Sequence, residues 1–198
     1  TLQRGKLNMA VMPSFASNDL PDIVAHYHQQ YPNINLAIEN IVMDQAIDKV
    51  RKGRCELAVI FAGQNMQGVH FTPLFSDQFS LIYAANYQST IQRLNRQNDL
   101  PGLLSLPMIA MDKDSSVRRW IDDVLDGYHV EPKIVAEVNQ LETLGRLVAK
   151  GMGVGIVPNL CRAQMQSLEV SMHPLGERFL MKDVGVVTPV GHGLSQAG

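Results

Sequence analysis

The sequence has little cysteine and no concentration of positive charge. Only Cys55 and Cys161 occur among 198 residues, so a disulfide-stapled secreted fold is excluded and a reduced, cytoplasmic protein is expected. The formal net charge is -2, and lysines and arginines nowhere form a run. Because nucleic acids and anionic membranes attract clustered cations, this segment is not expected to bind DNA or a membrane surface by itself.

Long apolar stretches are also missing. No segment approaches the roughly 20 apolar residues that a membrane-spanning helix needs, and Thr1 to Ala10 lacks the apolar middle of a secretory signal. Hydrophobic residues nevertheless make up 45% of the chain and are spread along it. That content is enough to bury a core in one domain or in two small lobes.

The first third of the chain alternates between strand and helix patterns. Its first helix is marked by Leu20, Ile23, Val24 and Tyr27, which fall at i, i+3, i+4 and i+7. The predicted elements are a strand over 6–12, a turn over 13–18, a helix ending at 31–33, a strand over 35–41, a helix over 44–52 and a buried strand over 57–61. Strands joined through helices of this length require crossover connections, so a mostly parallel sheet is expected.

The same βαβαβ order recurs later without any repeat of the sequence itself. Its predicted elements are a strand over 108–111, a turn over 112–116, a helix over 117–125, a strand over 133–137, a helix over 141–150 and a buried strand over 154–158. Between the halves, 71–84 is interpreted as paired strands and 89–97 as a polar helix. After the second half, 168–174 and 184–190 have strand-like patterns.

These patterns predict an α/β fold of two Rossmann-like βαβαβ lobes joined by two crossover segments. Lobe I is expected to comprise residues 1–76 and 178–198, because the last strand is free to return to the first lobe. Lobe II is expected to comprise 77–177.

The turns after the first strand of each half are candidate ligand sites. Parallel sheets bind ligands at the carboxyl ends of their strands, where helix N-termini present unpaired N–H groups and a positive dipole end. Ser14 and Phe15 follow the first strand of lobe I, and Ser115 and Ser116 follow the first strand of lobe II. Their matched placement favours a small anion held in a cleft between the lobes, although serine is also preferred at helix starts and in turns for structural reasons.

Two further residues follow later strands in the same way. Gly63 comes after the third strand, and Asn139 comes after the strand over 133–137. A turn glycine for Gly63 and a helix cap for Asn139 are the favoured explanations.

No catalytic or metal site is evident, and no cofactor is expected. The glycines of 151–155 follow a helix and open a strand, the reverse of a dinucleotide-binding motif, so a structural role is predicted for them. His26 and His28 are two residues apart on a helix and cannot share a metal. A redox role for Cys161 is remote, since Cys55 belongs to the other lobe.

Five segments together resemble a known family. The most specific is 147–158, which combines a helix end, glycines, a buried strand and a proline; the others are 5–11, 31–36, 53–59 and 73–75. In these segments the chain resembles the effector-binding domain of LysR-type transcriptional regulators, whose fold is that of the type 2 periplasmic binding proteins. Glu56 departs from the aspartate usual in the family, and 191–198 stands where the family normally begins a final helix.

The resemblance implies an effector pocket, an oligomer and DNA as a partner of the longer protein. By position, the pocket would be lined by Ser14, Phe15, Gly63, Ser115, Ser116, Asn139 and Met152. It also implies a homodimer or homotetramer, with DNA bound through an N-terminal winged helix-turn-helix that this chain does not contain.

Two alternatives from other classes stay open at this point. One is a periplasmic solute-binding protein of the same fold, which would need a signal peptide upstream of Thr1. The other is an enzyme on this fold, which would need a reactive residue or cofactor attachment site that the sequence does not show.

Overall fold

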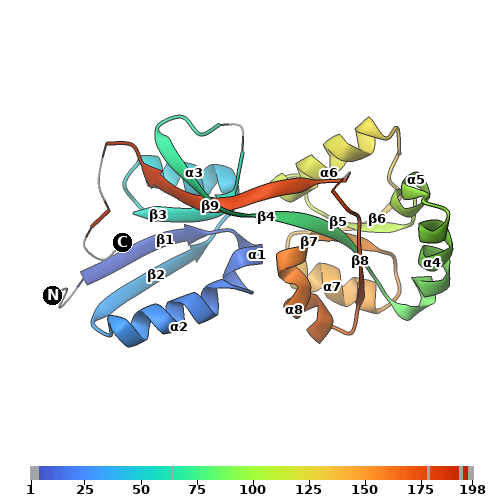
Figure 1. The fold of residues 1–198 in the computed structure, drawn as a ribbon, viewed down its shortest axis with the longest axis horizontal. Helices are drawn as coiled ribbons and strands as arrows, with labels where there is room; N and C mark the ends of the chain where they lie inside the picture. The colour runs from blue at the N-terminus through green and yellow to red at the C-terminus, as the bar shows by residue number, and fades with distance from the viewer. Residues whose placement is uncertain (1–4, 64, 178, 192–193, 196–198) are drawn as a thin grey trace. The chain divides into compact units, whose positions relative to one another are not determined.

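The computed structural model describes residues 5–63, 65–177, 179–191 and 194–195. The chain divides into two compact units (Figure 1). Unit 1 holds the described residues up to Asp77 and those from Lys182 onward, and unit 2 runs from Gln78 to Met181. The passages between the units therefore lie one and four residues beyond the positions expected from the sequence, 76/77 and 177/178.

Unit 1 is built on a sheet with the strand order β2-β1-β3-β9-β4. The strands are β1 (Gly5–Val11), β2 (Ile34–Asn40), β3 (Leu57–Phe61), β4 (Val69–Tyr83) and β9 (Met181–Pro189). β1 pairs in parallel with β2 and β3, as the crossover connections require, whereas β9 runs antiparallel to β3.

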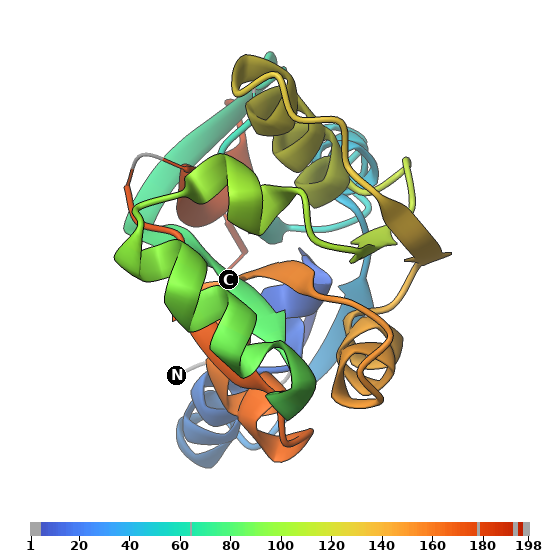
Figure 2. The same cartoon turned by 90° about the vertical axis from the view of Figure 1, so that its right-hand side faces the viewer.

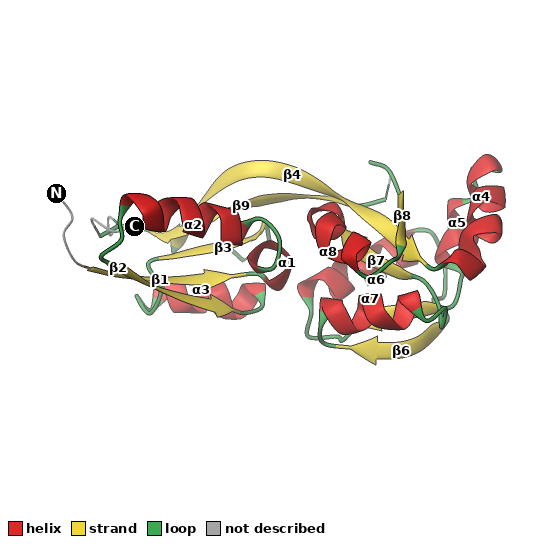
Figure 3. Cartoon of the chain, turned by 90° about the horizontal axis from the view of Figure 1, so that it is seen from below, coloured by secondary structure: helices red, strands yellow, loops and turns green. Residues whose placement is uncertain are grey.

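Helices cover both faces of this sheet. α2 (Leu20–Gln30) and α3 (Met43–Arg51) lie on opposite faces, as Figure 3 shows, and α1 (Pro13–Ala16) is a single turn between β1 and α2. α3 buries its apolar face against alternate residues of the strands. The resulting core comprises Ala10, Ala46, Ile47, Val50, Cys55, Ala58, Ile60, Val69 and Val187.

Unit 2 repeats the alternation of strands and helices. β5 (Met108–Met111) pairs in parallel with β6 (Ile134–Val138), and β7 (Gly155–Pro158) and β8 (Ser171–Pro174) each pair antiparallel to β4. One parallel bridge, Met108 to Val154, joins β5 to the segment that leads into β7.

The helices of unit 2 also lie on two faces. α6 (Ser116–Gly127) and α7 (Leu141–Ala149) lie on opposite faces of β5 and β6, as Figures 1 and 2 agree. The short elements of this unit are η1 (Ala85–Tyr87), α4 (Gln88–Arg96), α5 (Leu100–Leu104), η2 (Asn159–Cys161) and α8 (Arg162–Ser167). The core is formed by Ile82, Ile109, Leu144, Val148, Val157, Cys161, Met165 and Val170.

Two strand predictions need correction. The paired strands predicted over 71–84 are wrong, because β4 is one continuous strand of 15 residues. No glycine or Asn-Gly pair interrupts the alternation there, so nothing in this segment supplies the positive φ of a tight hairpin. The strand predicted over 168–174 begins only at Ser171, since α8 ends at Ser167 and Glu169 turns the chain with a φ of 61°.

No helix in the described part of the chain is both long and apolar enough to cross a membrane.

Candidate functional site

Three predicted ligand residues lie at one edge of the unit 1 sheet. β1 and β3 are parallel neighbours with Val11 opposite Val59, and the N–H of Met12 donates to the Val59 carbonyl at 2.9 Å. The segments that follow these two strands therefore leave the sheet at the same edge. Ser14 and Phe15, both buried in α1, follow β1, and Gly63 follows β3.

Gly63 is explained in part by packing. A Cβ atom at this position would lie 2.6 Å from the Met43 Sδ atom, at the start of α3. The absence of a side chain lets α3 begin close to the end of β3.

Three more predicted residues share an edge in unit 2. β5 and β6 are parallel neighbours with Met111 opposite Val138, and the N–H of Asp112 donates to the Val138 carbonyl at 2.8 Å. Ser115 and Ser116 follow β5, and the exposed Asn139 follows β6. The structure therefore brings these three residues to the same end of the strand pair.

Two helices begin at this unit 2 edge. Ser115 is the N-cap of α6, and its hydroxyl accepts a hydrogen bond from the N–H of Arg118 at 3.4 Å. α7 starts after Gln140, whose side chain makes no capping hydrogen bond. First-turn N–H groups and the positive ends of two helix dipoles are thus available beside Ser116 and Asn139, an arrangement that favours an anion.

Met152 does not join this group. It follows the C-terminus of α7 and precedes β7, and the bridge between Met108 and Val154 aligns this segment with the first residue of β5. Ser115 and Asn139 lie beyond the last residues of β5 and β6, so Met152 is at the opposite edge of the strands. Its side chain is exposed.

Arg118 is a buried charged residue that sequence reasoning missed. Its Nη1 atom donates to the Met111 carbonyl at 2.7 Å and to Glu137 Oε2 at 2.6 Å, and its Nε atom donates to Asp122 at 2.9 Å. Burial by itself would lower the pKa of Arg118, but the hydrogen bonds to Glu137 and Asp122 raise it overall. In the sequence, the i, i+4 spacing of Arg118 and Asp122 was the one feature that could have indicated this ion pair.

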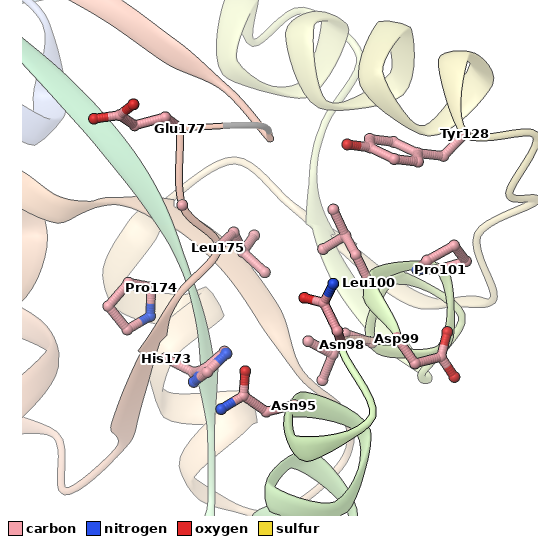
Figure 4. Close-up of a pocket in the computed structure, with 12 residues that line it drawn as sticks. Asn95, Asn98, Asp99, Leu100, Pro101, Tyr128, His173, Pro174, Leu175 and Glu177 are labelled. Carbon is pink, nitrogen blue, oxygen red and sulfur yellow. The ribbon is translucent and has the colours of Figure 1, made fainter.

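Unit 2 also contains a cavity that the sequence did not indicate, with a volume of about 670 Å³ (Figure 4). Its walls come from the end of α4, the segment through α5, the residue after α6, and β8 with the residues that follow it. The lining residues are Asn95, Asn98, Asp99, Leu100, Pro101, Leu103, Tyr128, His173, Pro174, Leu175, Gly176 and Glu177. None of them belongs to the predicted ligand set.

The described residues offer no metal site, and one of the two thiols is deactivated by burial. No group of three His, Cys, Asp or Glu side chains among them could hold a metal ion. Cys55 and Cys161 are buried in different units and form no disulfide, and burial raises the pKa of Cys55. A protonated, buried thiol is a poor nucleophile.

Comparison with known proteins gives a match over nearly the whole chain. A family model described as the LysR substrate binding domain matches residues 1–197. A probable RuBisCO transcriptional regulator from Trichormus variabilis is 25% identical over 162 residues, which cover 79% of this chain and 47% of that protein. The chain spans about half the length of the curated relatives it matches.

Solved structures show the same fold. The effector binding domain of QuiR in complex with shikimate aligns with a TM-score of 0.80 at 17% identity, covering 98% of this chain and 91% of that one. The regulatory domain of CcmR from Synechocystis PCC6803 in complex with 2-PG aligns with a TM-score of 0.81 at 16% identity, with the same two coverages of 98% and 91%. These likenesses confirm the predicted fold class.

Proposed function

Because this chain belongs to the family of LysR substrate binding domains, we propose that it senses a small anionic effector for a transcriptional regulator. The relatives named above are regulators and ligand-binding domains. They favour neither the periplasmic solute-binding alternative nor an enzyme.

One observation carries the choice of an anion. α6 and α7 both begin at the edge where β5 and β6 end, and the hydroxyls of Ser115 and Ser116 and the amide of Asn139 lie beside those helix starts. Backbone N–H groups and hydroxyls at such an edge suit a carboxylate, sulfate or phosphate. The ligand of QuiR, shikimate, carries a carboxylate and supports this class.

The residues proposed to contact the effector are those at the two strand edges. In unit 2 they are Ser115, Ser116 and Asn139, and Met152 is left out because it lies at the opposite edge. In unit 1 the corresponding edge offers Ser14, Phe15 and Gly63. Their part in binding stays a prediction, and a weaker affinity of Ser14→Ala for the binding anion would support it.

Replacing Ser115 by aspartate separates binding from folding. Aspartate is as good an N-cap as serine, so Ser115→Asp keeps the start of α6. The added carboxylate repels an anion at hydrogen-bond distance, so affinity should fall by at least about tenfold. Calorimetric titration of the wild-type chain with shikimate, sulfate and other small acids identifies a binding anion, and the variant is then titrated with the same compound.

The matched control is Ser89→Asp. Ser89 is an exposed residue in the first turn of α4, so the variant adds the same charge at another helix start of unit 2. It should bind the anion as the wild type does. Equal binding by Ser115→Asp would place the anion elsewhere and reject the α6–α7 edge as its site.

The regulatory output is also a proposal. We infer that the longer protein binds DNA through a segment outside this chain and that the effector changes its homodimeric or homotetrameric arrangement. Sedimentation of the full-length protein with and without the binding anion, followed by a DNA mobility shift, tests both steps. An unchanged oligomer and unchanged DNA binding would reject the coupling.

A further inference from the structure

We propose that unit 2 carries a second ligand site, in the cavity between α4, α5 and β8, which takes an uncharged, hydroxyl-bearing molecule such as a sugar or polyol. This site shares no residue with the α6–α7 edge. The second site can therefore be tested independently of the anion site.

The size of the cavity fits a small metabolite. Its volume of about 670 Å³ lies inside the range of roughly 300–1,000 Å³ typical of small-molecule sites. Leu100 and Leu175 face the cavity from α5 and from the segment after β8 (Figure 4). They supply the apolar surface on which the carbon skeleton of a ligand can pack.

Amides and a phenol supply the polar contacts. Figure 4 shows the amide of Asn98 and the hydroxyl of Tyr128 on either side of Leu100, both on the side that faces Leu175, with the amide of Asn95 below. Each of these groups can both donate and accept a hydrogen bond. Hydroxyl groups of a ligand also do both, so the two sets match.

The backbone that carries the Asn98 amide is held in a defined turn. Asn98 has a φ of 53°, in the left-handed region that asparagine tolerates. Its N–H donates to the Asn95 carbonyl at 2.9 Å, and the N–H of Asp99 donates to the Leu94 carbonyl at 3.0 Å. The turn is therefore fixed before any ligand arrives, which lowers the entropic cost of binding.

Charge argues against an ionic ligand. Among the described lining residues none is a lysine or arginine, and two are carboxylates, Asp99 and Glu177. Their negative charge disfavours an anion. For a cation they are poorly placed, since Asp99 Oδ1 accepts from the N–H of Gly102 at 2.9 Å and both carboxylates point away from the space between Asn98 and Tyr128 (Figure 4).

The side-chain NH₂ resonances of Asn95 and Asn98 report directly on this cavity. In a ¹⁵N-labelled chain, millimolar D-glucose or myo-inositol should shift both resonances in a saturable way. Millimolar succinate and putrescine serve as the anionic and cationic probes. The proposal is overturned if neither polyol shifts the two amides, or if succinate or putrescine shifts them more strongly than both polyols.

Two variants test whether the Asn98 amide contacts the ligand. Asn98→Gly removes the amide while accepting the positive φ without strain, and its affinity for the binding polyol should fall about three- to tenfold, the effect of losing a ligand hydrogen bond. Gln97→Ala removes the neighbouring exposed amide, which does not line the cavity, and should leave the affinity unchanged. Thermal unfolding without ligand checks that both variants fold, and equal losses in the two variants would overturn the site.

Discussion

The guanidinium of Arg118 and the carboxylate of Glu137 join the first turn of α6 to β6. Arg118 Nη1 lies 2.6 Å from Glu137 Oε2, and the same nitrogen donates to the Met111 carbonyl at the end of β5. One side chain, 5% exposed, thus ties α6 to both strands whose ends form the proposed anion site. A hydrogen-bonded buried arginine is a strong positional constraint, because an unpaired charge there would be costly.

Removing this arginine should destabilise the chain measurably. Arg118→Met keeps an apolar stem of similar length but leaves the Met111 carbonyl without its donor, so we expect the free energy of unfolding in urea to fall by about 1–3 kcal/mol. The loss is limited because Asp122 and Glu137 are 40% and 46% exposed and regain water.

The control is Arg146→Met. Arg146 pairs with Glu142 four residues earlier in α7, and both side chains are more than half exposed. Pairs of this kind contribute about 0.3–0.5 kcal/mol, so this variant should be nearly as stable as the wild type. A loss in Arg146→Met equal to that in Arg118→Met would contradict the assigned role of the buried guanidinium.

Gly153 should not tolerate a methyl group. A Cβ atom there would lie 2.5 Å from the Pro107 carbonyl oxygen, which already accepts the N–H of Val154 at 2.8 Å. Backbone cannot move aside cheaply, so Gly153→Ala should lower the free energy of unfolding by about 2 kcal/mol or more. Gly127→Ala is the control, because nothing beyond its chain neighbours and its own helix backbone lies within 4 Å of its Cβ position, and its stability should be unchanged or slightly higher.

Acidification should destabilise the chain partly through His173. Burial lowers the pKa of His173 below its ordinary value of 6.5. The unfolded chain therefore takes up the proton first, and stability present above pH 6.5 is lost as the pH falls toward the lower folded pKa. Urea unfolding at a series of pH values should show a weaker acid dependence in His173→Gln than in the wild type, and parallel curves would rule out this contribution.

The cap of α5 should be replaceable by an amide but not by a methyl group. Asp99 Oδ1 accepts from the N–H of Gly102, and asparagine can make the same bond. Asp99→Ala should cost about 1 kcal/mol of unfolding free energy and Asp99→Asn much less. Thermal unfolding of the two variants distinguishes a cap from a purely electrostatic role, for which both would be affected alike.

Periodicity predicted most of the architecture because each element buries one face. In α3 the spacing of Ala46, Ile47 and Val50 reports directly on which side chains enter the core. In α2 the same spacing misleads, because only Leu20 is buried and Ile23 is 54% exposed. The single-turn helix α1 and the five-residue α5 were not predicted, because segments so short leave too few positions for a periodic pattern. β4 was wrongly predicted as two paired strands. It is kept continuous by pairing with strands that are distant in sequence, and such pairing leaves no pattern within the segment itself.

The candidate site was predictable only as far as strand ends could be recognised. Ser115 and Asn139 follow parallel strands, and the structure places them at one edge as that rule requires. Met152 also borders a strand, but it precedes β7 instead of following it, so the rule for the carboxyl ends of strands does not apply to it. The cavity lined by Asn98 and Tyr128 joins segments 25 residues or more apart in sequence with no shared motif, so no local pattern could have revealed it.

The passage of the chain through β4 and back through β9 sets an order on its synthesis. Unit 2, from Gln78 to Met181, is one uninterrupted segment, whereas unit 1 is split around it. A ribosome therefore completes unit 2 before it makes Val184 to Val187, the residues that pair with β3. Until then the buried strand β3 lacks its antiparallel neighbour β9, and its backbone is unpaired along that side. A nascent or truncated chain would aggregate or attract a chaperone there.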